Sequence, residues 1–510
     1  MEPRETQTTV LQPRQRLWLT ALGVMLTLSL LQGCVPTQSG RPYHRSAQAQ
    51  QPCSYYAGYS KKYLPYRQQL AAGQWDTLLA TLTAEEEAIL AESRSEQNLA
   101  DELRLVGLME RASLALQSGN ADKSLKYCRL GQDLIEQRES ESYFSGAMSS
   151  VGSVFTDMAG AGEFGRYEAP GYEKVLLLDM AAMAYLLKGD DRAFNVARLA
   201  VQWQDEEKEK FEQELEELAR KEPPQADGRA RAQNTSQRLS STLDREFAKY
   251  DDHALSVANA FVNPFGDYIT GMVNEFKSIK IKSLLSNAHI AYKQALKLNP
   301  KSKVLKQAVR DTKRKRSASR LIHVVALDGF VPEKKVLSIP LEHNLEVELP
   351  TYEPIPSRVK TIKVTTAKGK VLATLSPVAD VEALALRHQK DSLPAIQAMV
   401  VASVIRDLVV VETGNSLLGG LGGLVRQVLD DHQEPDTTSW MTLPSRVLAA
   451  RIYPPKGLKT LKIQSYDHKG RKLAQQKLRL AKGGRHFVLV RSIDQSMHAY
   501  PSKSIWSAKK

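Results

Sequence analysis

The stretch that decides the fold of this chain is YLLKGDDRAFNVARLA, residues 185–200. The apolar end of one helix is followed by Gly189, then by Asp190 and Asp191, and then by a new amphipathic run. Glycine suits the left-handed residue that closes a helix, and a polar residue after it can begin the next helix. The stretch therefore predicts two consecutive helices joined by a tight turn.

The same turn pattern occurs twice earlier in the chain. It is centred on Gly73 in residues 70–82 (LAAGQWDTLLATL) and on Gly119 in residues 114–128 (LALQSGNADKSLKYC). The three glycines are 46 and 70 residues apart, so the repeat is irregular. We expect a succession of helix pairs over residues 54–317.

A fourth unit ends in NAHIAYKQALKLNP, residues 287–300. Ala288 and Ala295 let a neighbouring helix approach, Tyr292 fills the groove between helices, and Pro300 ends the helix. These positions resemble the second helix of a tetratricopeptide repeat, although the glycine spacing differs from the regular repeat of about 34 residues. The resemblance implies an irregular tetratricopeptide-like α-solenoid, and an unrelated helical bundle is the alternative.

Two polar segments separate the third and fourth units. Residues 205–220 alternate closely between acidic and basic side chains, which predicts a solvated helix. Residues 222–240 (EPPQADGRARAQNTSQRLS) contain a Pro-Pro pair and few apolar residues. Because such a composition cannot bury much surface, we expect a loop or hinge there.

After about residue 318 the apolar pattern changes from helical to alternating, which predicts strands. We expect a β-rich segment over 318–377, a helical insert over 378–435, a β-sandwich-like segment over 436–495 and a loose tail over 496–510. The expected fold class is α+β, with a small antiparallel sandwich after the helices. The predicted strands cover residues 321–327, 336–341, 345–350, 359–366, 370–376, 445–453, 458–467, 471–480 and 486–493.

The start of the chain has the layout of a lipoprotein signal peptide. A basic leader with Arg4, Arg14 and Arg16 precedes LWLTALGVMLTLSLLQGC, residues 17–34, whose apolar run extends from Leu17 to Leu31. Leu-Gln-Gly-Cys at its end matches the lipobox, in which the cysteine thiol is acylated. The apolar run is 15 residues long, short of the roughly 20 that span a bilayer. We therefore expect residues 1–33 to be removed and Cys34 to be lipidated; a transmembrane anchor is the alternative.

The mature chain would begin with an acylated tether over residues 34–53. Val35 replaces the Asp that retains Gram-negative lipoproteins in the inner membrane, so this likeness implies sorting to the outer membrane, facing the periplasm. Two cysteines remain besides the lipidated one, Cys53 and Cys128. They could pair in an oxidising compartment, or each could be a separate thiol, and their spacing does not decide between these.

The net charge of +13 is unevenly distributed. Residues 277–316 contain thirteen basic residues and one acid, a local charge of +12, whereas residues 205–217 contain eight acids and two lysines. The expected compartment excludes nucleic acid as the partner of this basic window. The window would bind an acidic envelope protein or an anionic glycan or lipid, or it would face the acidic segment of the same chain. The candidate binding residues are Lys277, Lys280, Lys282, Lys313, Arg314, Lys315 and Arg316.

Two aromatic segments are candidates for smaller sites. In VANAFVNPFGDYITGM (257–272), Asn263 can cap a helix that has Pro264 in its first turn. The candidate groove residues are Phe265, Tyr268 and Tyr292; a packed aromatic core is the alternative. In residues 436–444 (DTTSWMTLP), Trp440 would dock the sandwich on the helical insert or would be a binding hot spot.

No stretch of the chain predicts catalysis. The GGLGG of residues 419–423 lacks the GK[ST] of a P-loop, no GxSxG motif is present, and the histidines have no metal-ligand spacing. The acids of residues 205–217 lie on an exposed helix, whereas acid–base catalysis needs carboxyls tuned by burial. We therefore expect no enzyme activity, no metal and no cofactor.

Four segments together resemble a family of uncharacterised Gram-negative lipoproteins with a tetratricopeptide-like N-terminal half: residues 167–190, 259–272, 287–300 and 436–444. Members of that family often lie near genes for penicillin-binding-protein activators, which implies a link to cell-wall synthesis by association. The resemblance implies a non-enzymatic scaffold that holds envelope proteins on the concave face of its helical repeats. The alternatives are a stable subunit of a secretion or surface-polymer machine and an enzyme that modifies cell-wall polymers.

Overall fold

The computed structural model describes only part of the unit Ser54–Lys510. Cys34, Val35 and Cys53 lie outside the described residues, as do Lys315, Arg316 and the GGLGG stretch. The described residues are 59–93, 96–145, 167–220, 230–314, 318–340, 346–394, 396–397 and 437–503.

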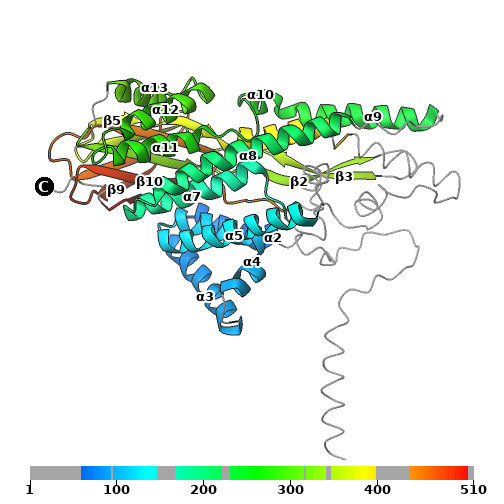
Figure 1. Ribbon diagram of the computed structural model, residues 1–510, viewed down its shortest axis with the longest axis horizontal. Helices are drawn as coiled ribbons and strands as arrows, with labels where there is room; N and C mark the ends of the chain where they lie inside the picture. The colour runs from blue at the N-terminus through cyan, green and yellow to red at the C-terminus, as the bar shows by residue number, and fades with distance from the viewer. Residues whose placement is uncertain are drawn as a thin grey trace, which may run out of the picture. The chain divides into compact units, whose positions relative to one another are not determined.

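The fold is mixed, with helices first and a β-rich region after them (Figure 1). A further helix of residues 381–394 follows the first six strands in the chain. The helices of the first part are α2 (Tyr59–Ala71), α3 (Trp75–Ser93), α4 (Glu96–Gln117), α5 (Ala121–Ser145), α7 (Gly171–Lys188), α8 (Ala193–Arg220), α9 (Ala230–Phe247), the 3-10 turn η1 (Ala248–Tyr250), α10 (Asp251–Ala254), α11 (Pro264–Lys277), α12 (Leu284–Leu298) and α13 (Lys303–Lys313).

The three predicted glycine turns are confirmed. Gly73, Gly119 and Gly189 have φ angles of 74°, 80° and 70°, in the left-handed region that glycine enters without steric cost. Gly189 closes α7, and its amide donates to the carbonyl of Leu186. Each glycine lies between two helices that are consecutive in the chain.

Most helices pack against the next helix of the described chain, and α8 packs against α11, past α9 and α10. Contacts join α4 to α5, α5 to α7, α7 to α8, α8 to α11, α11 to α12 and α12 to α13. Ala288, Tyr292 and Ala295 are buried on one side of α12. A Cβ atom at Gly271 of α11 would lie 2.5 Å from the Tyr292 ring, so glycine is what lets these two helices approach.

The strands form three sheets. A five-stranded sheet has the order β11-β10-β1-β7-β6, a four-stranded sheet the order β5-β4-β8-β9, and β2 and β3 form a hairpin. The strands are β1 (Leu321–Asp328), β2 (Glu333–Pro340), β3 (Glu346–Glu353), β4 (Thr361–Thr366), β5 (Val371–Thr374), β6 (Ser376–Asp380), β7 (Arg446–Ile452), β8 (Thr460–Tyr466), β9 (Lys472–Arg479), β10 (Arg485–Ile493) and β11 (Ser496–Pro501).

The expected all-antiparallel arrangement is wrong at one pair, because β1 runs parallel to β10. The two strands are 157 residues apart in the chain, from Asp328 to Arg485, so no hairpin constrains their direction. Strands from before and after the helical insert also share both larger sheets, since β1 pairs with β7 and β4 pairs with β8.

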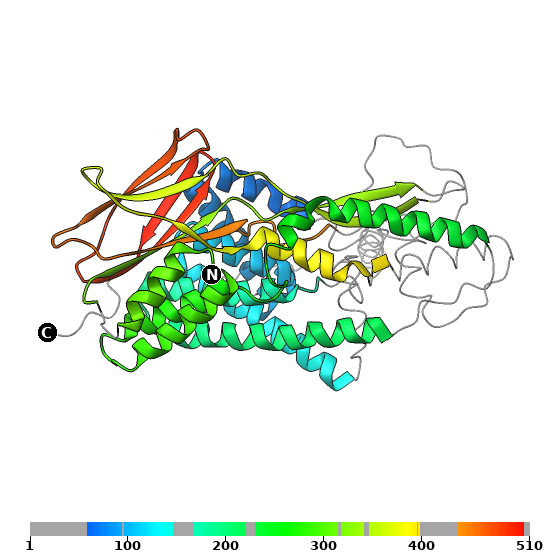
Figure 2. The same cartoon turned by 90° about the horizontal axis from the view of Figure 1, so that it is seen from above.

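The five-stranded sheet is the middle of three layers (Figure 2). On one face, Val325, Leu489 and Ala449 belong to the same core cluster as the helices. On the other face, Val324 and Val488 pack against residues of the four-stranded sheet. Because both faces are covered, every residue of β1 is buried.

Two segments predicted as irregular are regular. The expected tail begins with β11, which pairs with β10 and buries Met497 and Ala499. The expected hinge of residues 222–240 is helical from Ala230 onward. Leu239, Leu243 and Phe247 recur every four residues, and α9 packs them against the β2–β3 hairpin, which accounts for a helix in so polar a segment.

Candidate functional site

A buried carboxylate, Glu275 of α11, joins the helical layer to the sheet. It accepts hydrogen bonds from Arg451 Nε at 3.0 Å and from the Tyr292 hydroxyl at 2.9 Å. Nε2 of His323 lies 3.3 Å from the same carboxylate. Arg451 also reaches Asp311 of α13, with 2.7 Å between Nη1 and Oδ2. One ionic cluster therefore ties α11, α12 and α13 to β1 and β7.

Electrostatics fix the charge states in this cluster. Burial alone would raise the pKa of Glu275, but the guanidinium of Arg451 and the hydrogen bond from His323 hold that pKa well below its usual range. Burial lowers the pKa of His323, so its ring is neutral. Since a carboxylate can only accept, His323 donates from Nε2, and its Nδ1 accepts from the Tyr268 hydroxyl at 2.8 Å.

The residues predicted to line a groove lie inside this interface. Phe265, Tyr268 and Tyr292 have exposed fractions of 0%. Asn263 caps α11 as the sequence predicted, because its side chain accepts from the Phe265 amide at 2.9 Å, and Pro264 occupies the first turn. The cap directs α11 onto the sheet, so the aromatic side chains form core packing instead of an open groove.

The predicted basic window is largely exposed. We define the helical cationic face as the exposed cations of α12, α13 and the turns beside them. Lys277 is different, because it is half-buried between Phe194, whose ring centre is 4.7 Å from Nζ, and the carboxylate of Asp191 at 3.9 Å. The helical cationic face consists of Lys280, Lys282, Lys293, Lys297, Lys301, Lys303, Lys306, Arg310, Lys313 and Arg314.

The acidic segment of α8 does not cover this face. Glu207 pairs with Lys174 at 3.2 Å and with Lys210 at 3.0 Å, both outside the basic window. Among the side chains of residues 205–217 that the structure describes, none forms an ion pair with the helical cationic face, and Arg310 pairs with its neighbour Asp311. The positive charge of this face therefore points to solvent.

A second buried carboxyl group, that of Glu110, docks the loop of residues 437–445. Glu110 of α4 accepts from the amides of Met441 at 2.6 Å and Thr442 at 3.2 Å. Burial raises its pKa to about 8, although the hydrogen bonds from Thr442 and Met441 oppose the rise. Trp440 beside this contact is buried. The loop is thus hydrogen-bonded to α4, and Trp440 belongs to the same core cluster as Val381 and Leu384 of the helix of residues 381–394.

Two neighbouring helices carry further buried carboxyls. Burial raises the pKa of Glu173 in α7 to about 7, and burial next to the charge of Asp205 raises that of Asp267 in α11 to about 7. Burial and the charge of Asp267 raise the pKa of Asp179 well above its ordinary value. The Asn263 amide donates to Asp179 at 3.4 Å. These groups lie within core packing, and burial is the first cause of each raised pKa.

The raised carboxyl pKa values predict an unusual pH dependence. Between about pH 6.5 and pH 8 the free energy of unfolding is expected to fall by on the order of 2 kcal/mol, because folded Glu110 and Glu173 keep protons that the unfolded chain has lost. His253 acts in the same direction, since hydrogen bonds to Asp380 and Glu382 raise its pKa to about 10. Denaturant unfolding at several pH values measures this slope.

A matched variant isolates the main contribution. Glu110→Gln cannot ionise and is expected to flatten the decline between pH 6.5 and pH 8. His388 contributes little above pH 6.5, because burial lowers its folded pKa to about 4 and the unfolded side chain loses its last bound protons just above its ordinary pKa. A free energy of unfolding that rises with pH over this range would contradict the assignment.

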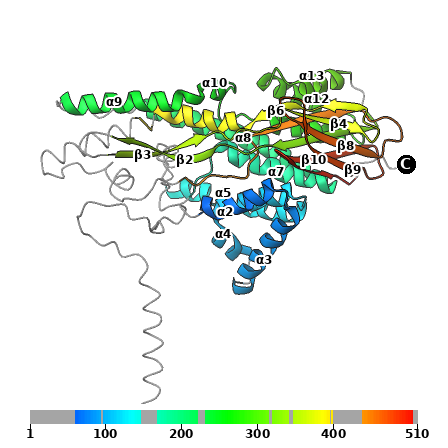
Figure 3. The same ribbon diagram turned by 180° about the vertical axis from the view of Figure 1, so that it is seen from behind.

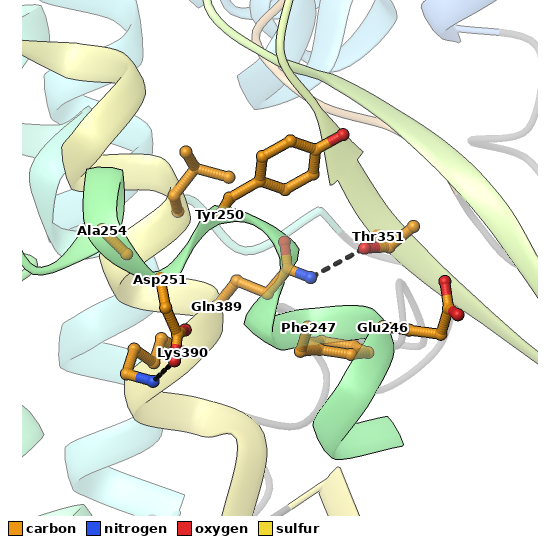
Figure 4. Close-up of a pocket in the computed structure, with 9 residues that line it drawn as sticks. Glu246, Phe247, Tyr250, Asp251, Ala254, Thr351, Gln389 and Lys390 are labelled. Atoms are coloured by element: carbon orange, nitrogen blue, oxygen red, sulfur yellow. Dashed lines mark hydrogen bonds and ion pairs between the residues drawn. The ribbon is translucent and has the colours of Figure 1, made fainter. Parts of the chain in front are cut away.

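One shallow pocket lies between η1, β3 and the helix of residues 381–394 (Figure 4). Its volume of about 10 Å³ holds roughly one water molecule. Two pairs of its lining residues already bond to each other, Gln389 to Thr351 at 2.8 Å and Lys390 to Asp251 at 2.5 Å. The pocket is too small for a substrate or cofactor.

Among the residues that the structure describes, no group of three or more His, Cys, Asp or Glu side chains is placed to hold a metal ion. No helix in the described ranges is long and apolar enough to cross a membrane. Cys128 is a buried free thiol, and burial raises its pKa to about 12.

The Glu275 cluster was missed at the level of sequence. Glu275, His323 and Arg451 are far apart in the chain, and spacing rules apply only within one element. A signal was nevertheless present, because His323 and Arg451 interrupt otherwise apolar strands, LIHVVAL and LAARI. Ionisable residues in a buried strand need partners, and so they point to a cluster without naming its members.

Comparison with known proteins adds no relative: no family model, no curated protein and no solved structure matches this chain.

Proposed function

We propose that this protein is a non-enzymatic scaffold of the cell envelope, anchored by Cys34 to the outer membrane and facing the periplasm. Its helical cationic face binds an acidic envelope protein. The observation that carries this proposal is that ten exposed cations of α12, α13 and the turns beside them have no ionic partner on another element of the described chain. The anchor and its location rest on the sequence of residues 17–35.

The proposal also covers the arrangement of the helices. We propose that its helices form an irregular tetratricopeptide-like solenoid. Three features support this: the sequential packing of neighbouring helices, the left-handed glycines between them, and the close contact of Tyr292 with Gly271. Such solenoids commonly serve as binding platforms.

We place the partner on another side of the helices than the concave face that the resemblance implies. This choice is supported by the core cluster that the helices share with β1, β7 and β10, because the side facing the sheet is covered. The outer side of α12 and α13 is available instead. Its exposed Ile290, with an exposed fraction of 56%, lies on the same helix as Lys293 and Lys297 and adds apolar contact area. A mixed cationic and apolar surface fits an acidic protein better than a fully solvated polyanion.

Capture in cells tests this function. The variant Lys293→Glu/Lys297→Glu/Lys306→Glu reverses three charges of the helical cationic face. We expect it to lower recovery of an acidic envelope protein, cross-linked in intact cells to the tagged chain, at least tenfold, because opposite charges steer and hold the partner. Quantitative mass spectrometry of the cross-linked material measures this recovery.

The matched control reverses three charges on another surface, Lys363→Glu/Lys462→Glu/Lys477→Glu, and should leave recovery unchanged. Recovery should also fall as salt is added before cross-linking. If the original chain and the helical-face variant recover equal amounts of the acidic protein, the proposal is wrong.

A further inference from the structure

A second basic surface lies on the four-stranded sheet. Residues 357–374 and 454–482 together carry fourteen basic residues and one acid, Asp467. Arg471 engages this acid, with 2.8 Å between Nε and the carboxylate. The sequence prediction missed this surface, because each segment alone is an ordinary run of strands and turns, and only the pairing of β4 with β8 brings the two together.

The sheet sorts apolar and basic side chains onto opposite faces. Ile362, Val364 and Ile463 point inward and belong to the core shared with the five-stranded sheet. Side chains alternate along a strand, so the residues between them point outward. The strands β4, β8 and β9 lie side by side (Figure 3). We define the sheet cationic face by four outward residues of these strands: Lys363, Lys462, Lys477 and Arg479.

Like charges on this face lie directly opposite one another. Lys462 of β8 pairs across the strands with Lys477 of β9. In the next row, Lys363 lies opposite Gln464, whose amide donates to Gln475 at 2.8 Å. Opposed like charges destabilise a sheet. The described residues place no acid between these lysines, so an external anion would relieve their repulsion.

The outward face of this sheet is broad. Four strands about 4.8 Å apart give a width of roughly 15–20 Å, and strands of this length give about 20–25 Å in the other direction. Lys363 packs on Tyr466, with Nζ 4.9 Å from the ring centre, so its stem lies along the sheet.

We propose that the sheet cationic face rests on an anionic lipid bilayer and binds the phosphates of its headgroups. Cations spread over one sheet face can each contact a headgroup phosphate, whereas a protein partner would need a central apolar anchor. The inference goes beyond the proposed scaffold role and rests on it for one point, the Cys34 anchor that keeps the chain beside a membrane. The acyl anchor at Cys34 and the sheet cationic face would then bind the same membrane together, and each would strengthen the other.

Vesicle binding tests the inference. The chain from residue 35 onward contains every described residue and has no acyl group, so its binding reports the protein surface alone. It is mixed at low salt with vesicles of phosphatidylcholine, or of phosphatidylcholine with one third phosphatidylglycerol. We expect binding to the anionic vesicles only.

Two variants with equal numbers of neutralised lysines locate the surface. Lys363→Gln/Lys462→Gln/Lys477→Gln is expected to weaken vesicle binding about a hundredfold, roughly fivefold per cation. Lys293→Gln/Lys297→Gln/Lys306→Gln on the helical cationic face should change it less than twofold. The sheet variant should melt no lower than the original chain, because it removes the repulsion between Lys462 and Lys477.

Three outcomes would overturn the inference: no binding to anionic vesicles, loss of binding in the helical-face variant, or full binding by the sheet variant. Binding to soluble polyphosphate with none to vesicles would also overturn it, in favour of a free anionic polymer. The proposed scaffold role is judged separately, since it fails through unchanged capture of a protein in cells while the vesicle assay contains only purified chain and lipid.

Discussion

Replacement of Arg451 by Met is expected to lower the free energy of unfolding by about 3–5 kcal/mol. The guanidinium makes a buried bidentate contact with Glu275 and also reaches Asp311. Without it, Glu275 is left as a buried carboxylate whose remaining partners, Tyr292 and His323, are neutral. The cost is large because the charge has already been removed from water. Denaturant unfolding followed by circular dichroism measures the loss.

A double variant separates the ion pair from the shape of the site. Glu275→Leu combined with Arg451→Met removes both charges, and we expect it to recover at least half of the lost stability. An apolar pair can replace a buried ion pair at little cost, whereas a lone charge cannot be accommodated. A single Arg451→Met variant within about 1 kcal/mol of the original chain would show that the cluster does not hold the layers together.

Replacement of Gly119 by Val is the second large effect, an expected loss of about 2–5 kcal/mol. Gly119 has a φ angle of 80°, which a β-branched residue adopts only under strain. A Cβ atom there would also lie 2.2 Å from the ring of Tyr500 in β11. The backbone strain is local to residue 119, whereas the clash with Tyr500 forces β11 away from the helices. We therefore expect a lower midpoint of thermal unfolding.

The chain offers a control for the backbone term. Gly470 has a φ angle of 74°, and nothing lies within 4 Å of a Cβ placed there. Gly470→Val should therefore cost only the strain of the left-handed conformation. Combining Gly119→Val with Tyr500→Ala should recover part of the loss, and equal losses at Gly119 and Gly470 would contradict the packing argument.

Elements with a regular apolar period could be predicted from the sequence. The glycine turns, the cap at Asn263 and most of the strands depend on neighbours within a few residues, and all of these are present in the structure. The parallel pairing of β1 with β10 could not be predicted in this way, since it joins two strands separated by most of the β-rich region. The prediction of a mixed α+β fold was correct, whereas the prediction that all strands pair antiparallel was wrong for β1 and β10.

Polar composition misled the prediction in two places. Residues 230–240 contain few apolar side chains, but Leu239 begins a four-residue spacing that is enough for a helix held by β2 and β3. Residues 496–501 were expected to be a tail, yet Met497 and Ala499 are buried beside β10. In both segments the packing partner is another element of the fold, the β2–β3 hairpin or β10. The composition of the segment itself does not indicate that partner.

The candidate sites also divide into features that depend on local sequence and features that depend on distant packing. Exposure of the lysines of α12 and α13 agrees with their helical spacing, whereas burial of Phe265, Tyr268 and Tyr292 follows from a sheet whose place over the helices only the structure reveals.

The measurement that tests the central claim most directly is photo-cross-linking at Ile290 in intact cells. Ile290 and Leu255 have exposed fractions of 56% and 55%, but only Ile290 lies on the helical cationic face. With a photoreactive residue at either position, we expect a discrete product with one acidic envelope protein from Ile290 and none from Leu255. That product should disappear with Lys293→Glu/Lys297→Glu. No product at Ile290, or the same product at both positions, would contradict the account.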